Sequence, residues 1–286
     1  MKILVTGYNG QLGYDVIRKI PSADECRGVD LQDFDITDKT QTMEYIRSYR
    51  PDAVVHCAAY TAVDKAEDDE ETCYRVNVIG TRNIAEACKE IGAKMLYVST
   101  DYVYGGKGSE PIDPAAQTDP QNVYGRTKLE GEEAVKSILE KHFIVRTSWI
   151  FGINGNNFVR TMLRLSGSRD VLTVVDDQIG SPTYTPDLAE LIVKMIHSDC
   201  YGTYNATNEN FCSWAEFAAE IMKLGNKTTV IKPIPSSEYP TKATRPLNSR
   251  LSKDCIEPFG RLPSWQNALE RYFVELEELN RGESKK

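Results

Sequence analysis

Two hydrophobic periods alternate along the first half of the chain, and this alternation restricts the folds that are open to it. Segments rich in β-branched and aromatic residues, which we expect to form strands, cover residues 2–7, 26–30, 52–59, 94–100 and 143–151. Segments with helical periodicity separate them, at residues 12–20, 40–49, 73–92 and 124–141. Strand–helix alternation of this kind predicts an α/β fold, a doubly wound parallel sheet with helices on both faces.

The pattern changes after Gly152. Helical periodicity dominates from there on, at residues 156–167, 186–198, 213–225 and 264–279, and the strand-like runs are short, at 171–175 and 228–234. We therefore expect a sheet domain over residues 1–152. Residues 153–286 are expected to form mainly a smaller, mostly helical lobe for substrate, with segments that could return to the sheet.

Composition and charge exclude several classes of partner. The net charge of -8, from 34 Lys and Arg against 42 Asp and Glu, argues against nucleic acid as a partner. No apolar run approaches the length of a membrane span, and the N-terminus lacks a signal-peptide layout. The seven cysteines are scattered without a CxxC pair, which is typical of a reducing compartment, so we expect a cytoplasmic protein.

A glycine-rich turn follows the first expected strand. Gly7, Gly10 and Gly13 lie in "VTGYNGQLG", where a helix begins. Glycines at this place allow a tight turn and a close approach of the backbone to a pyrophosphate at the helix N-terminus. The neighbouring positions Asn9, Gln11 and Leu12 would share that contact. Such glycines are common at strand–helix turns, so the pattern needs support from the rest of the chain.

Asp30 supplies that support, because it ends the second strand 17 residues after Gly13. A carboxylate at this distance is typical of one that binds the adenosine ribose, and its charge favours NADH over NADPH. By itself Asp30 could equally be a turn or capping residue; together with the glycine turn it predicts dinucleotide binding by residues 1–152. Further contacts with the cofactor are expected from residues that follow the second and third strands: Asp35, Ile36, Ala58, Ala59, Tyr60 and Thr61.

Tyr124 and Lys128 are four residues apart in a helical segment, so their side chains share a face. A phenol titrates near pH ~10, and a neighbouring ammonium would lower its pKa and let the pair deliver a proton to a carbonyl oxygen. Thr100 ends a strand between the glycine turn and this pair, where it could donate a hydrogen bond to the same oxygen. Taken alone, the Tyr–Lys pair also fits an ordinary amphipathic helix.

The order of glycine turn, strand-end Thr100 and Tyr124–Lys128 pair resembles that of the extended short-chain dehydrogenase/reductase family, over nearly the whole chain. The resemblance implies a Rossmann-like sheet, NADH or NADPH as cofactor, and a catalytic triad of Thr100, Tyr124 and Lys128. It also implies that Tyr124 and Lys128 contact the cofactor, and that Ser99 faces the scaffold. Dehydratases of the family carry an acid after Thr-Asp; Tyr102 stands there, so we expect reduction rather than elimination of water.

Several dispersed segments sharpen the resemblance, at residues 58–67, 146–152, 156–165, 177–185 and 245–251. They imply NAD(P)H-dependent reduction of the C4 ketone of dTDP-4-dehydro-L-rhamnose to dTDP-L-rhamnose. The substrate contacts that follow are Thr100, Asp101, Tyr102, Tyr124, Trp149, Asn157 and Arg245. Among these, Trp149 could pack against the sugar or belong to the core. Asn157 and Arg245 are expected at the diphosphate, which a guanidinium fork suits.

Three alternatives stay open at this stage. An epimerase of the same family would retain tightly bound NAD, a related reductase would take another keto sugar nucleotide, and a regulatory subunit like the β-subunit of methionine adenosyltransferase would not turn over. Some family members bind Mg²⁺ through glutamates at a dimer interface. Asp15 stands at one such place, but no second ligand is evident and the three histidines lack metal-ligand spacing, so we predict no metal. A homodimer stays open.

Overall fold

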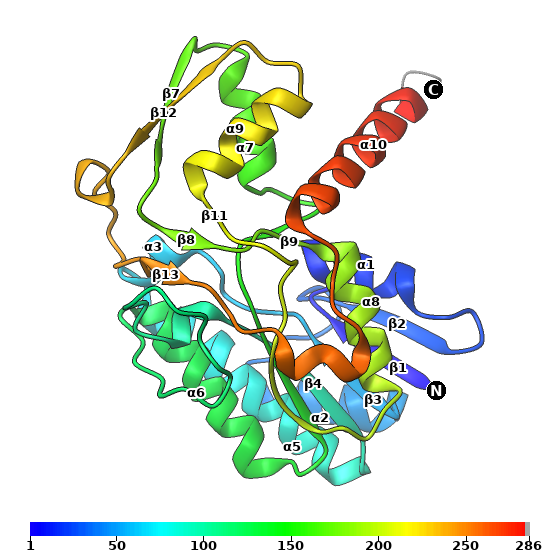
Figure 1. Cartoon of the computed structure of the whole chain (residues 1–286). Helices are drawn as coiled ribbons and strands as arrows, with labels where there is room; N and C mark the ends of the chain where they lie inside the picture. Colours follow the sequence, from blue (N-terminus) through cyan, green and yellow to red (C-terminus); the bar gives the residue numbers. More distant parts are fainter. Residues whose placement is uncertain (284–286) are drawn as a thin grey trace.

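The computed structural model describes residues 1–283, and its main feature is one sheet of six strands (Figure 1). Every neighbouring pair in this sheet is parallel, in the order β10-β5-β4-β3-β1-β2. Its strands are β1 (Lys2–Thr6), β2 (Glu25–Val29), β3 (Ala53–His56), β4 (Lys94–Thr100), β5 (His142–Thr147) and β10 (Gly202–Asn205). The predicted parallel α/β sheet is therefore confirmed.

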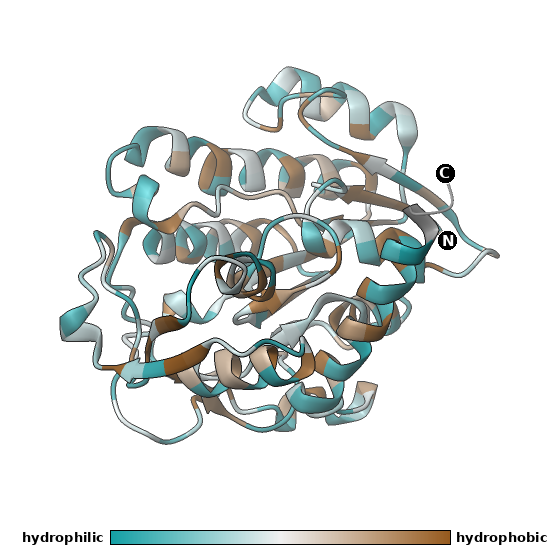
Figure 2. Cartoon of the chain, turned by 90° about the horizontal axis from the view of Figure 1, so that it is seen from above, coloured by the Kyte–Doolittle hydropathy of each residue, from teal (hydrophilic) through white to brown (hydrophobic). Residues whose placement is uncertain are grey.

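Helices cover both faces of this sheet. One face carries α1 (Gln11–Lys19) and α8 (Thr185–Ile196), and the other carries α2 (Lys39–Tyr49), α5 (Thr81–Ile91) and α6 (Val123–Ile138). Alternate residues of each strand point to opposite faces, so Ile3 and Val5 pack toward α1 and α8 while Leu4 packs toward α2 and α5. In Figure 2 the helices show teal and brown in alternating bands, as expected for helices that bury one face and expose the other.

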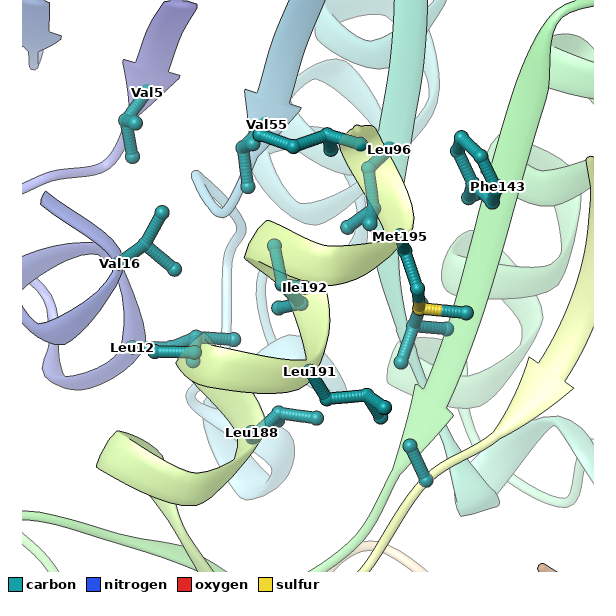
Figure 3. Packing of buried hydrophobic residues seen from close by; sticks show 14 of the residues in the cluster. Val5, Leu12, Val16, Val55, Leu96, Phe143, Leu188, Leu191, Ile192 and Met195 are labelled. Carbon is teal, nitrogen blue, oxygen red and sulfur yellow. The ribbon is translucent and has the colours of Figure 1, made fainter. Parts of the chain in front are cut away.

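The face beneath α8 forms the first hydrophobic core (Figure 3). Leu188, Leu191, Ile192 and Met195 project from α8 onto the sheet and meet side chains such as Val55, which come from the first half of the chain. In addition, β10 pairs with β5 at the edge of the sheet. Segments from beyond residue 152 thus complete the layer that the first half builds.

The rest of the second half forms a separate layer with its own aromatic core around Phe151, Phe217 and Tyr272. Its helices are α7 (Phe158–Ser166), α9 (Trp214–Leu224) and α10 (Trp265–Glu283). Its strands are short and include the parallel pair β7 (Val171–Val175) and β12 (Val230–Ile234), as well as β6 (Ile150–Phe151), β8 (Ile179–Gly180), β9 (Thr183–Tyr184), β11 (Cys212–Ser213) and β13 (Asn248–Ser249). In the described part of the chain, no helix is both long and apolar enough to span a membrane.

Two expected elements are interrupted. The expected strand 143–151 ends at Thr147, because Trp149 adopts a left-handed backbone conformation (φ 50°) and redirects the chain into β6, which pairs with β9 instead. The expected helix 73–92 consists of α4 (Glu70–Tyr74), a π-helical stretch η1 (Arg75–Gly80) and α5. Within η1, Asn77 binds the backbone of Tyr60 through both ends of its amide. Widened turns of this kind are frequent near functional sites.

Short helices fill the connections. They are α3 (Val63–Ala66), the 3₁₀ turn η2 (Asp101–Val103), η3 (Ser236–Glu238) and η4 (Asp254–Phe259). The turn η2 follows β4 directly, and Thr100 caps it by accepting a hydrogen bond from the amide of Tyr102. This turn places Asp101 and Tyr102 beside the end of the strand.

Candidate active site

A cleft of about 810 Å³ runs along the carboxyl ends of the parallel strands. This is the edge at which open α/β sheets bind ligands. Most of the residues singled out from the sequence line it: Gly7, Gly10, Gln11, Leu12, Gly13, Asp30, Asp35, Ile36, Ala58, Ala59, Thr61, Thr100, Asp101, Tyr102, Tyr124, Trp149 and Asn157. Four others, Asn9, Tyr60, Lys128 and Arg245, lie next to the cleft rather than in its wall.

The glycine turn has no room for a side chain at Gly7 or Gly13. Gly7 has φ 69°, and a Cβ atom there would lie 2.7 Å from backbone atoms of Ala58. A Cβ atom on Gly13 would lie 2.3 Å from the carbonyl oxygen of Gly7. Gly10 precedes α1 without a side chain that caps the helix, so the helix N-terminus at the cleft is available to an anion. This cradle fits a dinucleotide pyrophosphate.

Asp30 lies at the cleft wall directly after β2. Its carboxylate accepts hydrogen bonds from the backbone amides of Leu31 (2.9 Å) and Asn9 (3.3 Å). Asn9 thereby links the glycine turn to Asp30, although its own side chain is not part of the cleft wall. The carboxylate is held where a ribose with two free hydroxyls could meet it.

Thr100 and Tyr124 converge in the cleft from two elements. Thr100 is the last residue of β4, and Tyr124 lies in the first turn of α6, which Asn122 caps by accepting from the amide of Gly125 at 2.7 Å. A Cβ atom on Gly125 would lie 2.2 Å from the carbonyl oxygen of Tyr102, so α6 lies directly against η2 at this point. Both side chains line the cleft, and the Thr100 side chain opposes the rise that burial causes in the pKa of Tyr124.

Lys128 lies beneath the cleft, 2% exposed. Its ammonium donates to the carbonyl oxygen of Val98 at 2.7 Å and lies 4.0 Å from the centre of the Tyr97 ring. Burial lowers the pKa of Lys128 to about 7. From the sequence, this ammonium is predicted to lower the pKa of Tyr124. That prediction is wrong for the structure, where burial raises the pKa of Tyr124 and the Thr100 side chain only opposes the rise.

Asp101 is a buried carboxyl group in the cleft wall, 3% exposed. It accepts hydrogen bonds from Thr100 at 3.0 Å and from Ser249, in β13, at 2.5 Å. Burial raises the pKa of Asp101 to about 6, and these hydrogen bonds oppose the rise. Asp101 therefore ties the end of β4 to the second layer.

Trp149 both lines the cleft and packs against the aromatic core, so it combines the two roles considered from the sequence. It lines the cleft, while its ring stacks on Trp214 with the centroids 3.7 Å apart and the planes 16° from parallel. Asn157, also in the cleft wall, caps α7 by accepting from the amide of Arg160. Its amide group donates to the Gln11 side chain at 3.1 Å, which joins α7 to the first turn of α1.

Arg245 lies behind Tyr102. Its guanidinium donates to the Tyr102 hydroxyl at 3.2 Å and forms an ion pair of 2.6 Å with Asp64. Tyr60 is fixed through its backbone by Asn77 and packs, with Tyr124, against the small cluster of Ala66, Cys73 and Val123. Both residues support cleft residues rather than facing the cleft.

Sequence reasoning missed Thr147 and Ser148, which also line the cleft. Thr147 ends β5 and is the register partner of Thr100 at the end of β4. Its hydroxyl is buried and has no hydrogen-bond partner among the described residues. Like Thr100, Thr147 is a hydroxyl at the carboxyl end of a parallel strand, and this shared position is the signal that could have identified it.

Asp15 does not fit a magnesium ligand in this chain. It is 1% exposed, accepts a hydrogen bond from Thr185 at 2.6 Å, and lies 3.3 Å from the guanidinium of Arg18, which already supplies a positive charge. Within the described residues, no group of three or more His, Cys, Asp or Glu side chains gathers as a metal site.

A glycine cradle after the first strand and a helix with a Tyr–Lys pair, both at the carboxyl edge of one parallel sheet, define the short-chain dehydrogenase/reductase class. Within that class, the family model described as RmlD substrate binding domain matches residues 1–278. The chain belongs to this family.

Individual relatives match along almost their whole length. The spore coat polysaccharide biosynthesis protein SpsK of Bacillus subtilis (strain 168) is 41% identical over 96% of this chain and 97% of its own. The dTDP-4-dehydrorhamnose reductase of Aggregatibacter actinomycetemcomitans is 40% identical over 94% of this chain and 97% of its own. The crystal structure of a dTDP-4-dehydrorhamnose reductase from Bacillus anthracis str. Ames, in complex with NADP, is 42% identical with a TM-score of 0.93 and covers 96% of this chain and 99% of that one.

Proposed function

We propose that this protein uses NADH or NADPH to reduce the C4 ketone of dTDP-4-dehydro-L-rhamnose, which gives dTDP-L-rhamnose. The observation that carries the proposal is that Thr100 and Tyr124 converge in the same cleft as the glycine cradle. The choice of sugar rests on relatives of about the same length that are named for this reaction, such as the one from Aggregatibacter actinomycetemcomitans.

The residues of the cradle would hold the cofactor. The backbone of the turn from Gly7 to Gly13 would bind the pyrophosphate at the N-terminus of α1, and Asp30 would accept from the adenosine ribose. When bound, NAD(P)H supplies the hydride that C4 receives. In this proposal, residues 1–152 bind mainly the dinucleotide and residues 153–286 mainly the sugar nucleotide.

Tyr124 is the proton donor. Its phenol remains protonated at neutral pH, since burial raises its pKa, and this is the form that reduction requires. Thr100 would donate a second hydrogen bond to the carbonyl oxygen, which becomes the hydroxyl of the product. The ammonium of Lys128, which donates a hydrogen bond to the carbonyl oxygen of Val98, would stabilise the phenolate that forms when Tyr124 gives up its proton.

The sugar nucleotide would lie between the two layers. Asp101, Tyr102 and Trp149 border the space beside Tyr124, and Asn157 lies farther along the cleft. We assign Arg245 to the diphosphate through its position behind Tyr102. Because Arg245 already forms an ion pair with Asp64, binding the diphosphate would require its guanidinium either to contact both groups or to release Asp64.

The reaction itself is the first test. Oxidation of NADH and of NADPH should be followed with enzymatically generated dTDP-4-dehydro-L-rhamnose, and the product identified by NMR. We expect one equivalent of dTDP-L-rhamnose for each cofactor oxidised, with both cofactors used and a higher kcat/KM for NADH because of the Asp30 charge. A clear preference for NADPH would contradict the role given to Asp30.

Two outcomes would overturn the proposal. Protein that purifies with bound NAD and converts a sugar nucleotide without external reductant is an epimerase. Protein that binds NAD(P)H but oxidises none with this sugar, or oxidises it only with another keto sugar nucleotide, has a different role. Tyr124→Phe is the control for the chemistry: it should keep cofactor affinity and lose most of kcat.

We infer a cytoplasmic location for this reaction. The seven cysteines are all free in the structure, and Cys200 is exposed, which suits a compartment that keeps thiols reduced. Fractionation of the native cells with an antibody against the protein would check this, and recovery in a membrane or extracellular fraction would contradict it.

A further inference from the structure

Glu132 is a fully buried carboxylate in α6, one helical turn beyond Lys128. It does not line the cleft. It accepts a hydrogen bond of 2.6 Å from the Ser99 hydroxyl in β4, and bonds of 2.8 and 2.6 Å from Nε and Nη2 of Arg146 in β5. The ammonium of Lys136, on the same helix, lies 3.5 Å away. One carboxylate thus joins three elements that carry cleft residues.

Two partners of Glu132, Ser99 and Arg146, directly precede cleft residues in the chain. Ser99 precedes Thr100, and Arg146 precedes Thr147, and the two strands place Ser99 opposite Arg146 and Thr100 opposite Thr147. Because Glu132 binds both strands to α6, its contacts set the position of Thr100 relative to Tyr124. A shift of about 1 Å in such a pair is enough to slow a reaction strongly.

Arg146 is itself fully engaged. Its Nη1 atom donates to the Tyr104 hydroxyl at 2.6 Å and to the carbonyl oxygen of Pro114 at 2.9 Å. A buried ion pair adds little net stability compared with apolar residues of the same size. The pair with Glu132 is therefore poorly explained by stability alone.

Charge gives Glu132 a second role. The centre of the Tyr97 ring, in β4, lies 4.0 Å from the Lys128 ammonium. Lys128 also interacts electrostatically with Glu132, one helical turn away on the same face of α6, and with His56 in β3, Cys57 after β3 and Cys73 in α4. Burial lowers the pKa of His56 to about 3 and raises the pKa of Cys57 to about 12, so both are neutral at pH 7. Burial also raises the pKa values of Cys73 and Tyr97. Among these described groups that interact with Lys128, Glu132 is thus the one that carries negative charge.

We propose that Glu132 is a positioning residue for the reductase: it aligns the ends of β4 and β5 with α6, and its carboxylate keeps Lys128 protonated. The inference rests on the proposed function, because alignment and protonation matter only if Tyr124 delivers a proton. Its electrostatic half concerns the protein without ligands and can be measured without turnover.

Two matched variants separate charge from structure. Glu132→Gln and Arg146→Gln each remove one partner of the same ion pair, but they change the charge near Lys128 in opposite directions. The ε-carbon resonance of Lys128, assigned by its loss in Lys128→Met, should be titrated by NMR in ¹³C-lysine-labelled protein. We expect its midpoint to fall by about one pH unit or more in Glu132→Gln and not to fall in Arg146→Gln.

Turnover provides the second measurement. In Glu132→Gln, the decline of kcat with rising pH should move to lower pH by a similar amount, and kcat near neutrality should fall about tenfold. KM for NAD(P)H should change by less than about twofold, because Glu132 does not line the cleft. Glu132→Asp, which retains the charge, should keep the wild-type Lys128 midpoint while kcat falls through misalignment.

An unchanged Lys128 midpoint in Glu132→Gln, or midpoints that fall in both variants, would overturn the electrostatic role and leave an ordinary structural ion pair. If Glu132→Gln does not fold, Arg146→Gln and Lys136→Met carry the test, since each removes a cation near Glu132. A lower Lys128 midpoint in either would overturn the proposal, and equal or higher midpoints in both would support it. Wild-type protein that reduces no keto sugar refutes the proposed function, while the NMR result still decides the charge effect.

Discussion

At the scale of single residues, two neighbouring strands end in hydroxyls with different surroundings. Thr100 donates to Asp101 and accepts from the amide of Tyr102. The hydroxyl of its register partner Thr147 has no partner among the described residues. A buried hydroxyl without a partner costs about 1–3 kcal/mol, and because Thr147 lines the cleft, we expect a ligand bound there to supply the partner.

Thr147→Val should therefore separate stability from binding. Valine has nearly the same shape and removes the unpaired hydroxyl, so we expect the melting temperature to stay equal or rise. We expect KM for the sugar nucleotide or for NAD(P)H to rise about 5- to 10-fold, the value of one hydrogen bond. Steady-state kinetics with each ligand varied in turn would check this; unchanged KM values for both would refute a ligand contact.

Asp101 predicts a pH dependence of stability. Its pKa in the folded protein is raised to about 6, above that of an exposed carboxyl, so the protonated form is the one that folding favours. The stabilisation is complete below the unfolded pKa and is lost as the pH rises through about 6. Asp101→Asn should therefore be more stable than the wild type at pH ~8, by about 1–3 kcal/mol, and the difference should vanish near pH ~4. Urea unfolding at several pH values would measure it, and equal stability at both extremes would count against it.

At the scale of elements, close backbone contacts fix how strands and helices meet at the cleft. The first turn of α1 lies against the glycine turn at Gly13, and the first turn of α6 lies against η2 at Gly125. Neither contact has room for a side chain. Backbone contacts, and not adjustable side chains, thus fix the elements that carry the proposed cofactor cradle and the proposed proton donor.

Gly13→Ala should weaken cofactor binding at least about tenfold, because the new Cβ atom would displace the carbonyl of Gly7. The matched control is Gly92→Ala at the end of α5. Gly92 has a positive φ, 77°, which Gly13 does not, so an alanine there adds backbone strain, but no atom within 4 Å would meet its Cβ. Fluorescence titration with NADH should leave the control unchanged. Equal loss of affinity in both variants would mean that general destabilisation, and not the cradle, is responsible.

Much of the fold can be predicted from hydrophobic periodicity, because the spacing of apolar residues in long strands and amphipathic helices indicates which face is buried. The sequence does not reveal where tertiary contacts override that pattern. The break at Trp149 depends on its stack with Trp214, which lies 65 residues away, and η1 depends on the amide of Asn77. The four residues of β10 are too short for a periodic signal. In the site, residue types and order were enough to find Thr100, Tyr124 and the cradle, but not the burial that governs the pKa of Tyr124.

At the scale of the whole molecule, both halves of the chain contribute to the hydrophobic core beneath α8. α8 covers the face of the sheet made by the first half, and Ile192 in its middle is fully buried there (Figure 3). Asp101 and Ser249 add a bond between the layers at the cleft. Unfolding of either half should therefore carry the other with it.

Ile192→Ala tests this coupling. The cavity should destabilise the protein by about 2–4 kcal/mol and lower the melting temperature in a single transition, with kcat nearly unchanged at low temperature. Val230→Ala, at a position 61% exposed on β12, should change stability by less than about 0.5 kcal/mol. Two separate transitions in calorimetry of Ile192→Ala would contradict one shared core.

The order in which the ribosome delivers these parts follows from the position of α8 in the sequence. When residue 152 has been synthesised, five strands of the sheet have been made, but α8 and β10, which cover one face and one edge, have not. Translation proceeds at about 5–20 residues per second, so one apolar face of the sheet stays exposed to solvent for seconds. During that interval, we expect chaperones that bind exposed hydrophobic surface to bind the nascent chain until α8 has been synthesised.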